Sequence, residues 1–216
     1  FRRTVVTTGG RLDVFYPIVP DLDWLNRIVP LGVRTVQLRL KNATPEDIRK
    51  QIVGSMEVCA RHNCQLIVND YWREALELGA DYVHLGQEDL AAADVMALKA
   101  HGIKIGISTH SVEELETALA VEPDYVALGP IWETKLKVMK WAPQGLDRIR
   151  EWKTRIGSLP LVAIGGITPE RASSVIEAGA QSAAVITDFF THPDPEARIR
   201  TWLEWADRMR RQLTTT

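Results

Sequence analysis

Two acidic residues, Asp70 and Asp89, have the type and position that chemistry on a phosphorylated substrate requires. Each comes just after a short apolar run, residues 65–69 in one case and 81–85 in the other. Basic residues follow other apolar runs in the same way, namely Arg39, Lys41 and Lys137. Mg²⁺ in proteins takes one or two carboxylates and completes its octahedron with water and phosphate oxygens, while Lys and Arg hold the remaining phosphate charge. These residue types therefore indicate a site for Mg²⁺ and a phosphorylated substrate.

Asp70 alone also fits a structural role. It precedes the helical pattern 71–74, and Asp is a common helix cap. The pairing with Asp89 and the surrounding cations favours metal binding over capping.

Eight short apolar or β-branched runs, several of them continuous, predict strands buried on both faces. The expected strands are Val14–Val19, Thr35–Leu40, Gln65–Asn69, Asp81–Leu85, Lys104–Ser108, Tyr125–Leu128, Leu161–Ile164 and Ala183–Ile186. Segments of helical period separate them, with start signals at Thr44-Pro45, Ser111 and Thr168-Pro169 and C-cap glycines at Gly32, Gly79, Gly102 and Gly179. Strand–helix alternation repeated eight times predicts a single-domain (β/α)8 TIM barrel.

A doubly wound open sheet is the alternative α/β fold. It would usually show a glycine fingerprint after its first strand, whereas Val14–Val19 is followed by Pro20-Asp21-Leu22-Asp23. We expect one domain over residues 1–216, with an N-terminal extension at 1–12, a frayed end at 214–216, and a terminal helix near Pro195–Leu213. That helix should pack Ile199, Trp202, Leu203, Ala206, Met209 and Leu213 against the barrel.

A barrel makes a definite geometric prediction, because its active site lies at the carboxyl ends of the strands. The polar residues at those ends are scattered in sequence and should meet at one mouth. They are Gln37, Arg39, Lys41, Asn69, Asp70, Gln87, Asp89, Ser108, His110, Thr134–Lys137, Thr187 and Asp188. Gly165-Gly166 ends the seventh strand, where backbone N–H groups could bind phosphate, or where a tight turn could simply require positive φ.

Other residue types argue against other chemistries. No His pair has a zinc-ligand spacing, no Gly-x-Ser-x-Gly motif occurs, and neither Cys59 nor Cys64 has an activating neighbour. We expect His84 to be a satisfied core histidine and His110 to help start a helix. Trp132 is the tryptophan that falls in a loop after a strand rather than in a helical pattern.

Composition excludes two further function classes. The chain has 216 residues, with 26 basic and 28 acidic side chains and a net charge of −2, which would not attract nucleic acid or an anionic membrane surface. No apolar stretch approaches the ~20 residues of a membrane span, and no apolar segment follows Phe1-Arg2-Arg3 as in a secretory signal. We expect a cytoplasmic protein with reduced cysteines and small-molecule substrates. The oligomeric state is not indicated.

The ordered motifs of this chain resemble those of the thiamine phosphate synthase family over roughly Tyr16 to Phe189. The motifs are Gln37-Leu38-Arg39-Leu40-Lys41, Asn69-Asp70-Tyr71-Trp72, His84-Leu85-Gly86-Gln87-Glu88-Asp89-Leu90, Gly106-Ile107-Ser108-Thr109-His110, Gly129-Pro130-Ile131, Ala142-Pro143-Gln144-Gly145 and Ala163-Ile164-Gly165-Gly166-Ile167. The family joins an aminopyrimidine methyl diphosphate to a thiazole phosphate with Mg²⁺, releasing diphosphate.

The resemblance implies a role for each matching residue. Mg²⁺ would be held by Asp70 and Asp89. The pyrimidine diphosphate would contact Gln37, Arg39, Lys41, Asn69, Ser108 and Lys137, of which Arg39, Ser108 and Lys137 would serve catalysis. The thiazole phosphate would contact Thr134, Gly165, Gly166, Ile186 and Thr187. The implied reaction is a dissociative substitution, which explains why no general base stands out.

The chain departs from the family pattern at two places. Where the family usually has Thr-x-Thr-Lys, this chain has Leu136 in place of the second Thr, and Lys135 adds a cation that could compensate. After the eighth strand, Asp188 introduces a negative charge near the expected thiazole phosphate.

Two alternatives share the resemblance. A related thiazole tautomerase lacks the carboxylate pair and has His where this chain has Pro130. A catalytically silent barrel that binds thiamine intermediates would be expected to have lost Asp70, Asp89 or Lys137, and all three are present.

Overall fold

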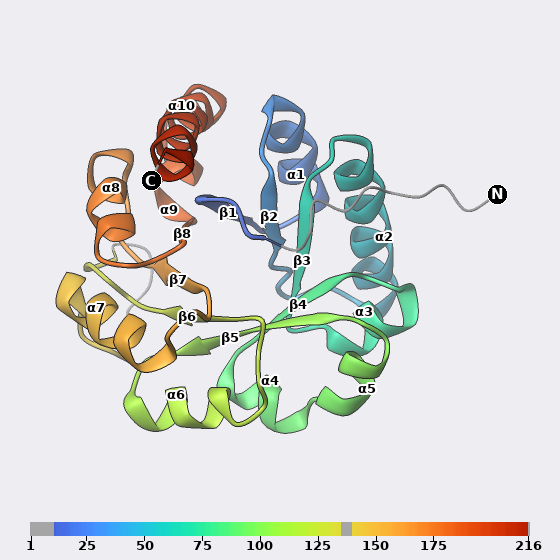
Figure 1. Ribbon diagram of the computed structural model, residues 1–216. Helices are drawn as coiled ribbons and strands as arrows, with labels where there is room; N and C mark the ends of the chain where they lie inside the picture. Colours follow the sequence, from blue (N-terminus) through green and yellow to red (C-terminus); the bar gives the residue numbers. More distant parts are fainter. Residues whose placement is uncertain (1–10, 135–139, 216) are drawn as a thin grey trace.

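Eight parallel strands close into a barrel with the order β1-β2-β3-β4-β5-β6-β7-β8, in a computed structural model that describes residues 11–134 and 140–215 (Figure 1). The strands are β1 (Phe15–Val19), β2 (Thr35–Leu38), β3 (Gln65–Asn69), β4 (Tyr82–Leu85), β5 (Lys104–Thr109), β6 (Tyr125–Leu128), β7 (Leu161–Ile164) and β8 (Ser182–Val185). Pairing of β8 with β1, with Phe15 opposite Ala183, closes the ring and confirms the TIM barrel over the open sheet.

Helices form the outer layer of the barrel (Figure 1). They are α1 (Leu22–Ile28), the 3₁₀ turn η1 (Val29–Leu31), α2 (Pro45–Arg61), α3 (Trp72–Leu78), α4 (Gln87–Ala92), α5 (Val95–Ala100), α6 (Val112–Leu119), α7 (Gly145–Ile156), α8 (Pro169–Glu177), α9 (Thr187–Phe190) and α10 (Pro195–Thr214). The helix α10 contacts both α8 and α1, which completes the ring of helices where the chain ends. No helix in the described ranges is long and apolar enough to cross a bilayer.

The helix boundaries follow the local signals in the sequence. Thr44 caps α2 by accepting a hydrogen bond from the Asp47 amide at 3.3 Å, and Ser111 caps α6 by accepting from the Glu114 amide at 3.2 Å. Thr168 stands at the N-cap of α8, with Pro169 as its first residue. The glycines expected at C-caps all have positive φ: 117° at Gly32, 72° at Gly79, 73° at Gly102 and 119° at Gly179.

Successive side chains along each strand point to opposite faces of the barrel wall and so contribute to two different hydrophobic cores. The larger core lies between the strands and the helices and includes Val36, Ile107 and Leu128. The smaller one fills the barrel interior and consists of Leu12, Tyr16, Ile18, Ile67, Tyr82, Tyr125, Ala127, Val162 and Ala184. Leu12 is buried in this interior core, so the expected N-terminal extension ends before that residue.

The terminal helix packs against the barrel as expected, but two residues differ from the expected buried face. Ile199, Trp202, Ala206 and Met209 are buried, and Leu203 packs partly buried against the core. Leu213 was expected in that face but is 48% exposed. Trp205 is buried instead, because its indole packs edge-on against Trp202 with centroids 5.4 Å apart. The helix continues through Thr214.

Candidate active site at the carboxyl ends of the strands

Asp70 and Asp89 lie against each other at the carboxyl ends of β3 and β4. Asp70 follows the last residue of β3 with a φ of 67°, and Asp89 lies in the first turn of α4. Burial, the negative charge of Asp89 and a hydrogen bond between the two carboxyl groups raise the pKa of Asp70 to about 6. Arg39 and a hydrogen bond from Asn69 act in the opposite direction. The two acids that sequence analysis paired are therefore brought together.

Capping of α3 does not explain the position of Asp70. The N-cap residue of α3 is Tyr71, without a side-chain capping hydrogen bond. The backbone carbonyl of Asp70, rather than its carboxylate, accepts from the Trp72 amide at 2.8 Å. The carboxylate is thus left for the pair with Asp89. No cluster of three or more His, Cys, Asp or Glu side chains suited to a metal occurs in residues 11–134 and 140–215. Two carboxylates fit an ion that takes its other ligands from water and phosphate.

The candidate residues of β2 and β3 line the same mouth. Gln37 and Asn69 are buried, Arg39 is half-buried, and Lys41 is exposed in the loop beyond them. The Gln37 side chain points into the barrel interior, where its amide contacts the Tyr16 hydroxyl. The Arg39 charge acts on both Asp70 and His84, lowering the pKa of each, which places its guanidinium at the entrance of the barrel.

A chain of hydrogen bonds crosses the barrel interior directly below this mouth. Gln37 Nε2 donates to the Tyr16 hydroxyl at 2.8 Å, and the hydroxyls of Tyr16 and Tyr125 are 2.8 Å apart. His84 Nδ1 lies 2.6 Å from the Tyr125 hydroxyl, and its Nε2 lies 2.7 Å from Ser108 Oγ. Strands β2, β1, β6, β4 and β5 each supply one member of this Gln37–Ser108 chain.

The expectation that His84 is a satisfied core histidine is confirmed. Both ring nitrogens have hydrogen-bond partners, and the ring stacks on Tyr125 with centroids 5.5 Å apart. Burial, together with the positive charge of Arg39, lowers the pKa of His84 to about 4. Burial also raises the pKa values of Tyr16 and Tyr125. At neutral pH the imidazole is therefore neutral and both phenols keep their hydrogens.

The loop after β7 is a tight turn that packs against the loop after β6. Gly165 and Gly166 have φ values of 106° and 65°. A Cβ on Gly165 would lie 2.6 Å from the Cα of Pro130, and one on Gly166 would lie 2.8 Å from the Cβ of Trp132. The Trp132 amide donates to the Gly165 carbonyl at 3.0 Å. Close approach and positive φ thus require glycine at both positions.

Trp132, the tryptophan expected in a loop rather than in a helix, packs against this turn. The guanidinium of Arg171 lies over its ring, 5.1 Å from the centroid, and donates to the Gly166 carbonyl at 3.1 Å. Thr134 lies half-buried two residues further on. Lys135, Leu136 and Lys137 lie outside the described residues.

The structure changes the expected role of Asp188. Its carboxylate accepts from Arg198 Nε at 2.8 Å and Nη2 at 2.9 Å, and from the indole N–H of Trp202 at 2.8 Å. Both donors belong to α10, so this acid ties α9 to the terminal helix and its charge is compensated. The neighbouring Ile186 packs against the interior core, and Thr187 begins α9.

His110 serves the start of α6, as expected. Its backbone N–H and its Nδ1 both lie 2.8 Å from the Glu114 carboxylate. Its ring stacks on Trp141 with centroids 5.4 Å apart. Gln144 donates to the His110 carbonyl at 2.9 Å, which joins the loops after β5 and β6. Gln87 also has a structural role, since it donates to the Ser108 carbonyl at 2.8 Å.

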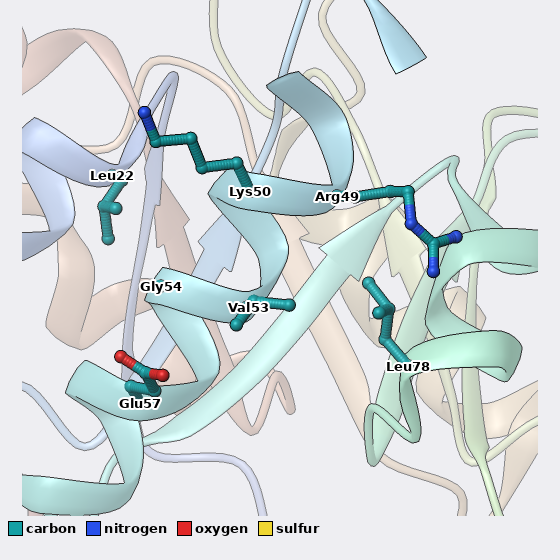
Figure 2. Close-up of a pocket in the computed structure, with 7 residues that line it drawn as sticks. All are labelled: Leu22, Arg49, Lys50, Val53, Gly54, Glu57 and Leu78. Carbon is teal, nitrogen blue, oxygen red and sulfur yellow. The ribbon is translucent and has the colours of Figure 1, made fainter. Parts of the chain in front are cut away.

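An apolar hollow on the outside of the barrel lies away from these residues (Figure 2). Leu22 of α1, Val53 and Gly54 of α2 and Leu78 of α3 line it, with charged side chains of α2 at its rim. None of the expected site residues lines this hollow, so the barrel mouth is the candidate active site.

Comparison with known proteins identifies the family of this chain. The sequence model of the family described as thiamine monophosphate synthase matches residues 15–189. A thiamine-phosphate synthase of Rhizobium etli is 59% identical over 193 residues, which cover 89% of this chain and 95% of the relative. A thiamine-phosphate synthase of Neisseria meningitidis is 44% identical over 188 residues, covering 87% of this chain and 92% of the relative.

A solved structure of a thiamine phosphate pyrophosphorylase also matches this chain. The thiamine phosphate pyrophosphorylase from Pyrococcus furiosus superimposes with a TM-score of 0.76 and 26% identity, covering 90% of this chain and 95% of that one. The chain therefore belongs to the thiamine monophosphate synthase family and is a transferase enzyme of thiamine biosynthesis.

Proposed function

We propose that the chain condenses 4-amino-2-methyl-5-pyrimidinylmethyl diphosphate with thiazole phosphate, using Mg²⁺ and giving thiamine phosphate and diphosphate. Family membership supports the reaction, and one feature of the mouth supports the metal. Asp70 and Asp89 share a hydrogen bond beside Arg39 at the carboxyl ends of the strands, where barrel enzymes bind their substrates.

The carboxylate pair has the electrostatics of a cation site. Repulsion from Asp89 and partial burial hold the pKa of Asp70 at about 6, so the ionised pair is unfavourable until a positive charge compensates it. A divalent ion with water and diphosphate oxygens as its remaining ligands would supply that charge. Asp70 and Asp89 are the residues we assign to hold Mg²⁺.

The pyrimidine diphosphate would bind above the interior hydrogen-bond chain. Gln37, Asn69 and Ser108 offer amide and hydroxyl groups suited to an aminopyrimidine ring, and Arg39 and Lys41 offer positive charge to the diphosphate. Lys137, which we also assign to the diphosphate, lies outside the described residues.

Departure of diphosphate is the step that needs assistance. Asp70 and Asp89 would hold the Mg²⁺, which would supply positive charge for the departing diphosphate. Arg39 contributes further positive charge at the same place, and the barrel holds the two substrates in line. The aminopyrimidine is electron-rich and stabilises the methylene cation that remains, and the thiazole nitrogen attacks with its own lone pair. Catalysis therefore requires no protein nucleophile and no general base.

The thiazole phosphate would bind at the turn after β7 and the start of α9. We assign Thr134, Gly165, Gly166, Ile186 and Thr187 to this subsite. The pairing of Asp188 with Arg198 and Trp202 supports the assignment, because an uncompensated carboxylate beside Thr187 would repel the phosphate.

A coupling assay tests the proposal. Purified protein is mixed with both substrates and Mg²⁺, and thiamine phosphate is followed by its oxidation to fluorescent thiochrome. We expect product that disappears with EDTA and returns with excess Mg²⁺. Binding of both substrates without product would favour the silent thiamine-intermediate-binding barrel, and isomerisation of the thiazole alone would favour the tautomerase.

A further inference from the structure

With Gln37 Nε2 as the atom that faces Tyr16, the hydrogen-bond chain from Gln37 to Ser108 has one direction that satisfies all of its hydrogens. Gln37 Nε2 donates to Tyr16, so the Tyr16 hydroxyl hydrogen must go to its other partner, Tyr125. The Tyr125 hydrogen must then go to His84 Nδ1. A neutral imidazole whose Nδ1 accepts carries its hydrogen on Nε2, and that nitrogen faces Ser108 Oγ.

The reverse direction leaves a buried hydrogen without an acceptor. If His84 donated from Nδ1 to Tyr125, Tyr125 would donate to Tyr16. The Tyr16 oxygen would then receive two hydrogens, from Tyr125 and Gln37, while its own hydrogen had no acceptor in the chain. Tyr16 is 1% exposed, so bulk water does not reach its hydroxyl and the unpaired hydrogen would be costly.

From this direction, and building on the proposed function, we propose that His84 is a positioning residue that fixes the Ser108 hydroxyl as a hydrogen-bond donor to the pyrimidine substrate. Ser108 Oγ receives the Nε2 hydrogen of His84, so its own hydrogen is turned away from the network toward the mouth. A ring nitrogen or a diphosphate oxygen of the substrate can accept that hydrogen.

A glycine makes this arrangement possible. A Cβ on Gly106 would lie 2.0 Å from the Tyr125 Cζ, so the phenol ring occupies the space that a side chain from β5 would fill. The ring also packs edge-on against Tyr16, with centroids 6.2 Å apart, and at a tilt against Tyr82, with centroids 5.7 Å apart. Packing on three sides therefore holds the Tyr125 hydroxyl within reach of both Tyr16 and His84.

The position of the hydrogen on His84 can be measured without substrate. In protein with ¹⁵N-labelled histidine, the ring nitrogen shifts distinguish a protonated nitrogen from an unprotonated one, and His84→Gln identifies the signal among five histidines. We expect Nε2 protonated and Nδ1 unprotonated in the wild-type protein at neutral pH. The same tautomer should persist in Tyr16→Phe, because Tyr125 would still donate to His84. A wild-type ring protonated at Nδ1 would overturn the inference.

Kinetics of two variants then separate positioning from packing. His84→Met keeps side-chain volume but cannot donate to Ser108, whereas the amide of His84→Gln can. We expect His84→Met to raise the KM for the pyrimidine diphosphate by about tenfold, the loss of one hydrogen bond. His84→Gln should stay within about threefold, and the KM for thiazole phosphate should change by less than about twofold in both.

Tyr82→Phe is the matched control, an interior aromatic outside the hydrogen-bond chain, and should leave both KM values at the wild-type level. Equal KM values in wild type and His84→Met, or equal losses in His84→Met and His84→Gln, would overturn the positioning role. Absence of thiamine phosphate with the wild-type protein would instead refute the proposed function, while the tautomer measurement would still stand on its own.

Discussion

Replacement of Asp70 by Asn should make the metal-free protein more stable at neutral pH. In the folded chain Asp70 has a pKa of about 6, against an ordinary value of 3.8, because it is partly buried beside Asp89. The folded state therefore holds a proton more tightly than the unfolded state does. The contribution of Asp70 to the free energy of unfolding of the wild type is therefore lost as pH rises from about 4 through about 6, and it is absent above that range. Asn carries no charge, so the variant avoids the loss.

The size of the effect follows from the shift. A pKa of about 6 instead of 3.8 corresponds to at most about 3 kcal/mol. The carboxyl is only partly buried, so solvent screening reduces the expected gain to about 1 kcal/mol. For a chain of this size that gain raises Tm by about 2–4 °C. The φ of 67° at position 70 adds no penalty, since Asn tolerates the left-handed region well.

Thermal unfolding in EDTA tests this expectation at two pH values. At about pH 8, Asp70→Asn should unfold above the wild type, and at about pH 4 the difference should vanish. Saturating Mg²⁺ at about pH 8 should reverse the order, because the ion stabilises the wild type and not the variant. An Asp70→Asn protein that is no more stable than wild type in EDTA at pH 8 would refute the electrostatic reasoning.

Three further expectations follow from the same contacts. Gly106→Ala should destabilise the protein by about 2–3 kcal/mol in urea unfolding, because its Cβ would collide with the Tyr125 ring; a change below about 0.5 kcal/mol would contradict that packing. Asp188→Asn should cost about 1–2 kcal/mol of stability by weakening the contacts to Arg198 and Trp202. The KM for thiazole phosphate should stay within about twofold in that variant, and a several-fold fall would show that the Asp188 charge does reach the phosphate. The Mg²⁺ concentration for half-maximal activity should rise as pH falls below about 6, because protons compete for Asp70; an activation constant that is flat between pH 5 and 8 would argue against Asp70 as a ligand.

Local pattern was sufficient to predict the strands of this barrel. Gln65–Asn69, Tyr125–Leu128 and Leu161–Ile164 match the structure residue for residue. The strand expected over Thr35–Leu40 ends at Leu38, because the chain already turns into the mouth at Arg39 and continues as loop. Placing the polar residues at the ends of the strands was enough to predict that Asp70 and Asp89 meet.

The interior network and the partners of Asp188 could not be predicted in this way. Tyr16 and Tyr125 look like ordinary core aromatics in sequence, and 109 residues separate the two hydroxyls that meet. Gly106 has no turn signal, since its role is to leave room for a ring from the next strand. Asp188 is compensated by donors 10 and 14 residues further along, on a helix whose docking angle no local pattern specifies.

The most direct test of the active-site assignment is a crystal structure with thiamine phosphate, diphosphate and Mn²⁺ in place of Mg²⁺, using the anomalous signal of the metal. We expect the anomalous peak between the carboxylates of Asp70 and Asp89, in contact with diphosphate, and the thiazole phosphate at the turn containing Gly166. A metal bound to other residues while the product occupies the mouth would contradict the assignment.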